Sequence, residues 1–185
     1  MIFFLVQGKC AVEILKKFEI LDRKAITTPM ASNLKLLCDA SLETVDATMY
    51  RQMICSLMCL TNTRPDICFV VNTLSQFLTD PRNAHLVVKH VVRYLKGTVD
   101  YRLKYDTNQK ANLHGYVDLD WAGNATNRNI TSGCCFSLGS SMISWFSRKQ
   151  SCVALSTTEE DYIVACLTSC KEVWIRKLFY DLFNL

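Results

Sequence analysis

The sequence lacks the features that mark secreted, membrane-spanning and zinc-binding proteins. It has ten cysteines but only three histidines and no Cys-x-x-Cys, so the ligand spacing of a zinc site is missing. The apolar residues 1–6 are too few for the core of a signal peptide. No stretch approaches the roughly 20 apolar residues of a membrane span. We therefore expect an intracellular protein, in the cytoplasm or nucleus, with no membrane contact and with reduced, buried thiols.

Charge of neither sign dominates the composition. The formal net charge is +4, half of the 185 residues are hydrophobic, and 21% are charged. A buried core is therefore expected, and global disorder is excluded. The mild positive charge permits contact with nucleic acid but does not require it, because dedicated nucleic-acid-binding domains carry stronger and more clustered charge.

The first half of the chain is predicted to be mostly helical. A short strand is expected at residues 1–6, and apolar positions at helical spacing predict helices at 10–18, 47–60, 65–78 and 81–96. Pro65 and Pro81 suit first helical positions, and Asp80 suits an N-cap. Gly97 is well placed to end the last of these helices. Residues 27–46 are predicted to form a linker.

The second half has the pattern of strands followed by one long helix. Strands are predicted at 101–105 and 113–122, and a hairpin at 133–138 and 142–147. Ser156 with Glu159 predicts a capped helix start. The apolar face of that helix is predicted to include Ile163, Cys166, Leu167, Cys170, Trp174 and Leu178. The expected fold class is α+β, with three antiparallel strands and a long helix after a helical region.

Acidic residues occur on the strand and on the helix of this second half. Asp118 and Asp120 are two apart, so a strand directs both to one side. Asp161 lies in the first turns of the helix. Converging carboxylates bind Mg²⁺, and the bound metal activates water near a phosphodiester. The alternative is that these residues have no such role, because acidic residues are common at strand ends and are favoured by the helix dipole.

Basic residues offer a second kind of candidate site. Lys89, Arg93 and Lys96 line one side of a predicted helix, and Arg148 and Lys149 follow a strand. Such residues contact phosphates, but they are also typical of an ordinary solvated helix face. The tryptophans are predicted to lie in the core and not to stack on bases: Trp121, Trp145 and Trp174.

Short motifs occur in a fixed order along nearly the whole chain. They include Thr61-Asn62-Thr63-Arg64-Pro65-Asp66-Ile67, Arg93-Tyr94-Leu95-Lys96-Gly97-Thr98, Asp120-Trp121-Ala122-Gly123 and Ala154-Leu155-Ser156-Thr157-Thr158-Glu159. No single motif is specific. The ordered set resembles the end of the reverse transcriptase region and the ribonuclease H domain of Copia-type retrotransposon Pol polyproteins.

The resemblance implies a division of the chain and an activity. Residues 1–97 would form the connection helices at the tail of the reverse transcriptase, and residues 98–185 an incomplete ribonuclease H-like domain. The family's activity is hydrolysis of the RNA strand of RNA–DNA hybrids with Mg²⁺. Its first two catalytic, metal-binding carboxylates fall on Asp118 and Asp161, and the second of these is normally a glutamate.

The resemblance also implies that this chain is inactive. The family's third and fourth carboxylates are expected beyond residue 185, so we expect a truncated segment that binds Mg²⁺ poorly, in effect a pseudoenzyme. Two alternatives stay open, a non-catalytic module that binds a hybrid or other nucleic acid, and an inert transposon relic. The sequence does not predict the oligomeric state.

Overall fold

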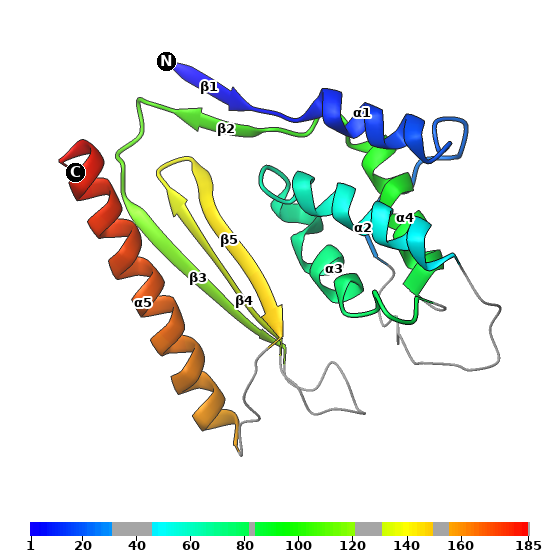
Figure 1. Ribbon diagram of the computed structural model, residues 1–185. Coiled ribbons are helices and arrows are strands. Elements are labelled where there is room, and N and C mark those ends of the chain that lie inside the picture. Colours follow the sequence, from blue (N-terminus) through cyan, green and yellow to red (C-terminus); the bar gives the residue numbers. More distant parts are fainter. Residues whose placement is uncertain (31–45, 82–83, 121–130, 150–155, 185) are drawn as a thin grey trace. The chain divides into compact units, whose positions relative to one another are not determined.

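The fold is α+β, as predicted. The computed structural model describes residues 1–30, 46–81, 84–120, 131–149 and 156–184, and these ranges contain five helices and two small antiparallel sheets (Figure 1). The chain divides into two compact units, Ile2–Lys104 and Met1 with Tyr105–Leu185. We describe each unit by itself. The expected division at residue 97 concerns functional regions, and it stays a prediction.

The first unit is built from four helices. In chain order its elements are β1 (Ile2–Leu5), α1 (Gly8–Lys17), α2 (Ala47–Leu60), α3 (Pro65–Ser75) and α4 (Ala84–Gly97). Their apolar faces meet in one core, to which α4 contributes the stripe Val88, Val91, Val92 and Leu95. The periodic spacing of these residues in the sequence places them on one side of the helix. The helices at 10–18, 47–60 and 65–78 are confirmed within a few residues.

Two helix starts in this unit follow the expected chemistry. The Asp46 carboxylate caps α2 by accepting hydrogen bonds from Thr48 N at 2.8 Å and Met49 N at 3.3 Å, and Pro65 opens α3. The prediction that Pro81 is the first helical residue of the next helix is wrong, because Pro81 is buried in irregular backbone. Helix α4 is described from Ala84, residues 82–83 lie outside the described residues, and the capping role of Asp80 stays a prediction.

Strand β1 pairs with β2 (Leu103–Asp106) in a two-stranded sheet. The carbonyl of Met1 accepts a hydrogen bond from Thr107 N at 3.0 Å. Every residue of β1 is apolar and exposed. The expected strand at residues 1–6 is therefore confirmed, but it contributes little buried surface.

The second unit contains a three-stranded antiparallel sheet in the order β3–β4–β5. The strands are β3 (Leu113–Asp120), β4 (Thr131–Leu138) and β5 (Ser141–Lys149). The last two form the predicted hairpin, and Gly139 in its turn has φ +58°. Glycine suits this position because side chains with a Cβ rarely adopt left-handed backbone.

The long helix α5 (Thr157–Phe183) packs against β3 and β4. Ser156 caps it as predicted, since its hydroxyl accepts a hydrogen bond from Glu159 N at 3.2 Å. Asn184 ends it in left-handed backbone with φ 54°. The core between helix and sheet contains Cys134, Phe136 and Ile175.

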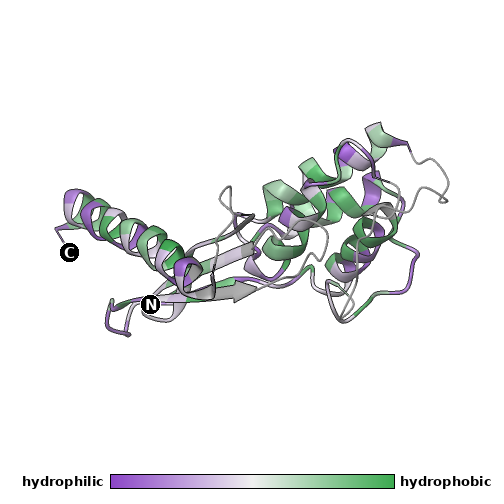
Figure 2. Cartoon of the chain, turned by 90° about the horizontal axis from the view of Figure 1, so that it is seen from below, coloured by the Kyte–Doolittle hydropathy of each residue, from purple (hydrophilic) through white to green (hydrophobic). Residues whose placement is uncertain are grey.

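The predicted apolar face of α5 is wrong, apart from the half-buried Ile163. The helix buries Val164 and Ile175 against the sheet, whereas Leu167 is 50% exposed and Trp174 is 53% exposed. Cys166, Cys170 and Leu178 are exposed as well. Hydrophobic and hydrophilic residues alternate along α5 (Figure 2), so the helix has apolar residues on more than one side. Periodicity predicted the helix but not the side that packs.

Two expectations about single residues also change. The prediction that Trp174 lies in the core is wrong, Trp145 is half-buried, and Trp121 lies outside the described residues. The expected burial of the thiols holds for Cys68 and Cys134 and is wrong for four exposed cysteines: Cys55, Cys59, Cys166 and Cys170.

No helix in the described ranges is sufficiently long and apolar to cross a membrane. The expected location in the cytoplasm or nucleus stays a prediction.

Candidate functional site

Asp118 lies in the second half of β3, and its backbone is opposite Gly133 of β4. The backbones of Arg148 and Lys149 are opposite Ser132 and Thr131 at the end of β5. The side chains of Asp118, Arg148 and Lys149 lie outside the described part of the structure. Their predicted roles in metal or phosphate binding therefore rest on backbone position alone.

Asp161 is exposed in the second turn of α5. This helix runs back along the sheet, opposite in direction to β3 (Figure 1). Leu113 at the start of β3 and Phe179 near the end of α5 pack against the same cluster. The first turns of α5, which carry Asp161, therefore lie towards the half of β3 that carries Asp118.

A metal ion shared by Asp118 and Asp161 would require the two carboxylates to converge. Mg²⁺ holds its oxygen ligands at about 2.1 Å in an octahedron, so two carboxylates on one ion must approach closely. Among the described residues, no three histidine, cysteine, aspartate or glutamate side chains gather in a group that could hold a metal. A metal at such a site would supply charge for a phosphodiester and activate water. Of the two predicted ligands, the structure describes the side chain of Asp161 and not that of Asp118.

The basic residues of α4 hold a neighbouring segment of the chain. Arg93 Nε donates to the carbonyl of Lys24 at 2.9 Å, and Lys96 Nζ donates to the carbonyl of Arg23 at 2.6 Å. Ile26 N donates to the carbonyl of Arg93 at 3.4 Å. Residues 23–28 therefore lie along α4, and we call them the strap. Both cations keep further N–H donors beyond those used here, and Lys89 is exposed on the same helix.

The strap adds two cations that sequence reasoning missed. Arg23 and Lys24 are exposed, and their carbonyls are the ones held by Lys96 and Arg93. Their basic side chains are visible in the sequence. Their position beside α4 depends on tertiary hydrogen bonds between residues about seventy positions apart, which no local pattern predicts.

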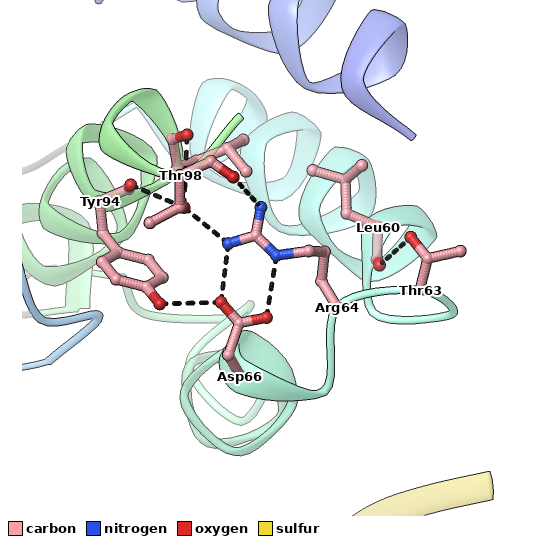
Figure 3. Close-up of polar contacts among 7 residues, drawn as sticks. Leu60, Thr63, Arg64, Asp66, Tyr94 and Thr98 are labelled. Atoms are coloured by element: carbon pink, nitrogen blue, oxygen red, sulfur yellow. Dashed lines mark hydrogen bonds and ion pairs between the residues drawn. The ribbon is translucent and has the colours of Figure 1, made fainter. Parts of the chain in front are cut away.

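A buried polar network joins the start of α3 to the end of α4 (Figure 3). Arg64 is only 4% exposed. Its Nε and Nη2 donate to the two oxygens of Asp66 at 2.9 and 2.7 Å, while Nη1 donates to the carbonyl of Thr98 at 2.9 Å. The Tyr94 hydroxyl donates to Asp66 at 2.9 Å. The guanidinium also lies over the rings of Tyr94 and Tyr101.

The electrostatics of this network follow from burial and charge. Burial alone would raise the pKa of Asp66, but the hydrogen bonds and charge of Arg64, with the Tyr94 hydroxyl, outweigh it and hold that pKa below its usual range. Burial, followed by the hydrogen bond to Asp66, raises the pKa of Tyr94 to about 12. Both groups therefore keep their hydrogen-bonding states near neutral pH. The network has a structural role within the first unit.

Comparison with curated proteins gives three informative relatives. The chain is 37% identical over 179 residues to the retrovirus-related Pol polyprotein from transposon RE1 of Arabidopsis thaliana, covering 96% of the chain and 12% of that polyprotein. It is 36% identical over 187 residues to the corresponding polyprotein from transposon TNT 1-94 of Nicotiana tabacum, covering 97% of the chain and 14% of the relative. It is 37% identical over 175 residues to an uncharacterized mitochondrial protein of Arabidopsis thaliana, covering 92% of the chain and 71% of the relative.

The chain belongs to the Copia-type retrotransposon Pol polyprotein family. The resemblance inferred from the ordered motifs is confirmed. No family model and no solved structure matches the Pol chain. Because the aligned residues cover nearly all of it, both compact units share in the similarity. The Pol chain spans about an eighth of the polyproteins that it matches.

The residues of the Arg64–Asp66 network belong to the motifs that indicated the family. Four of its residues lie in the motifs that carried the resemblance, Arg64 and Asp66 in one, and Tyr94 and Thr98 in another. In the Pol chain these motifs meet at an ion pair in which the Arg64 side chain is buried and the Asp66 side chain is 28% exposed. Sequence reasoning used them only as family markers. One local signal could have indicated the ion pair of Arg64 and Asp66. It is a proline at a helix start with a basic residue before it and an acidic residue after it.

Proposed function

We propose that this Pol chain corresponds to the end of a reverse transcriptase region followed by the first part of a ribonuclease H-like domain. The observation that carries the proposal is the order of elements in the second unit. A three-stranded antiparallel sheet is followed by a helix packed on it, with Asp118 on β3 and Asp161 on α5. These are the two acidic positions that correspond to the family's metal ligands within this chain.

The complete site of such a domain would hydrolyse the RNA strand of an RNA–DNA hybrid with Mg²⁺. We propose that the 185-residue polypeptide by itself does not. Metal charge supplies much of the stabilisation of a phosphodiester transition state, and losing even one preorganised electrostatic contact commonly costs about 10²–10³ in rate. The support for this proposal is that two positions of this polypeptide, Asp118 and Asp161, match the family's metal-binding carboxylates, whereas the family's complete site has four.

The proposal is tested by incubating the purified polypeptide with a labelled RNA–DNA hybrid and Mg²⁺ or Mn²⁺. No cleavage above the background of an Asp118→Asn preparation is expected. Cleavage by the wild-type chain that Asp118→Asn abolishes would overturn the inactive assignment and support a functional site. Equal cleavage by both preparations would indicate a contaminating nuclease.

A second candidate function is binding of an RNA–DNA hybrid or other nucleic acid without cleavage. It is favoured by the strap, which adds Arg23 and Lys24 to the basic residues of α4. Their side chains are exposed, and it is their backbone carbonyls that accept hydrogen bonds from α4. Replacing these side chains should therefore remove charge without releasing the strap.

Fluorescence anisotropy with a labelled hybrid tests this candidate. We expect binding at low salt that weakens steeply as salt rises, because cations on phosphates release counterions. The double variant Arg23→Gln with Lys24→Gln should bind more weakly and show a smaller salt slope. Lys177→Gln on α5 is the matched control and should not change binding. Equal binding by the wild type and the double variant would contradict this function. The absence of binding at low salt would also contradict it, and would favour an inert relic.

A further inference from the structure

Two cysteines from different helices lie beside the same hydrogen bond in the first unit. Cys10 is half-buried in the first turn of α1, and Cys59 is exposed in the last turn of α2. These two helices pack against each other. The hydroxyl of Thr63, just after α2, donates to Oε1 of Gln7, just before α1, at 2.8 Å.

Helix geometry places both thiols near this hydrogen bond. Cys10 follows Gln7 by three residues, and the first turn of α1 is closed by Ala11 N donating to the Gln7 carbonyl at 3.0 Å. Cys59 lies in the last turn of α2, which ends at Leu60, and Thr63 follows that end. We call the contact between Gln7 and Thr63 the joint, because it connects the start of α1 to the end of α2. Both cysteines therefore lie in the helix turns next to the joint.

The electrostatics of Cys10 agree with this placement. Burial raises the pKa of the Cys10 thiol most, the Glu13 carboxylate adds to the rise, and the Cys59 thiol adds to it further. The contribution of Cys59 agrees with the position of both thiols beside the joint, because a charge interaction falls off with distance.

We propose that Cys10 and Cys59 form a reversible disulfide that locks α1 to α2, which makes this joint responsive to the thiol–disulfide balance of its surroundings. The oxidant is a small disulfide such as oxidised glutathione. The exposed Cys59 thiolate attacks one of its sulfurs, which gives a mixed disulfide and releases one reduced thiol. The Cys10 thiolate then attacks the Cys59 sulfur and expels the second reduced thiol, and the proton of Cys10 passes to solvent.

The other exposed cysteines are less suited to internal crosslinking. Cys55 and Cys59 are four apart on α2, and Cys166 and Cys170 are four apart on α5. Side chains at this spacing have Cβ atoms about 5–6 Å apart, whereas a disulfide requires about 3.8 Å. Closing such a pair would distort its helix. Residues on two packed helices can approach without breaking either one.

The raised pKa of Cys10 predicts how the reaction depends on pH. The second step needs the Cys10 thiolate, which forms only above the ordinary range of a thiol. The mixed disulfide at Cys59 should therefore accumulate near pH 7, and conversion to the internal disulfide should quicken as pH rises towards 9.

The proposal is tested by equilibrating the whole 185-residue chain in graded mixtures of reduced and oxidised glutathione. After alkylation of free thiols and proteolysis, mass spectrometry should find Cys10 linked to Cys59 as the main internal disulfide. Cys55→Ser is the matched control and should leave this linkage intact. A main product linking Cys55 to Cys59 or Cys166 to Cys170, or glutathione on Cys59 with no internal disulfide at any pH up to 9, would overturn it.

Thermal unfolding provides a second readout. A crosslink between residues 10 and 59 closes a loop of about 50 residues, so the Tm of the oxidised chain should rise by roughly 5 °C or more. The rise should disappear on reduction and in Cys10→Ser and Cys59→Ser, and it should persist in Cys55→Ser. Equal Tm values for the oxidised and reduced wild-type chain would contradict the lock.

Discussion

At the scale of single residues, the ion pair of Arg64 and Asp66 holds two helix ends together inside the first unit. Arg64 is almost completely buried, and each of its donor nitrogens has a partner. A buried charge is tolerated only when it is paired and hydrogen-bonded, and removing one partner leaves the other charge uncompensated. In this chain, the residues of the family motif that form this ion pair therefore stabilise the fold.

Asp66→Asn should destabilise the chain at pH 7. The substitution leaves the Arg64 guanidinium buried without its counter-charge, so the free energy of unfolding should fall by about 3 kcal/mol. Urea denaturation of the wild type and the variant measures this difference. Glu172→Gln is the matched control, because it breaks an exposed ion pair with Arg176 and should change stability by less than about 1 kcal/mol. Equal effects of the two substitutions would contradict the structural role.

The same ion pair predicts how stability depends on acid. The pKa of Asp66 is lower in the folded chain than its ordinary value, so the unfolded chain takes up this proton first as pH falls. The contribution of Asp66 is therefore fully present above the ordinary pKa of about 3.9 and is lost as pH falls through the lower, folded value. Stability measured from pH 6 to pH 3 should decline less steeply in Asp66→Asn than in the wild type. An unchanged slope would show that another group controls acid unfolding.

At the scale of secondary-structure elements, α5 shows which information the sequence holds. Ser156 and Glu159 predicted where the helix begins, because capping is a local interaction between residues three apart. The packed side was predicted wrongly, because apolar residues occupy more than one side of this helix and only the sheet decides between them.

Substitutions on the two sides of α5 test the packing directly. Ile175→Ala should lower the free energy of unfolding by about 2–4 kcal/mol, because it opens a cavity against Phe136 and Cys134. Leu167→Ala removes a half-exposed side chain on the other side and should cost less than about 1 kcal/mol. Chemical denaturation of both variants measures the contrast. A larger cost for Leu167→Ala would mean that the side predicted from the sequence is the one that packs.

At the scale of the whole molecule, the sequence predicted the α+β class, most of the elements and the family. These follow from periodicity, turn chemistry and an ordered set of motifs, all of which are local or read along the chain. The strap beside α4, the joint between α1 and α2, and the packing of α5 on the start of β3 depend on contacts between distant residues. No local pattern in the sequence contains these contacts.

The central proposal is that Asp118 and Asp161 do not by themselves hold a metal ion in this polypeptide. Nuclear magnetic resonance with Mn²⁺ tests it, because the paramagnetic ion broadens the signals of nearby amides. At micromolar Mn²⁺, the amide signals near Asp118 in β3 and those near Asp161 in α5 should not broaden together. The Asp118→Asn variant should show the same broadening by Mn²⁺ as the wild type. Joint broadening of both segments that Mg²⁺ displaces and Asp118→Asn removes would contradict the account.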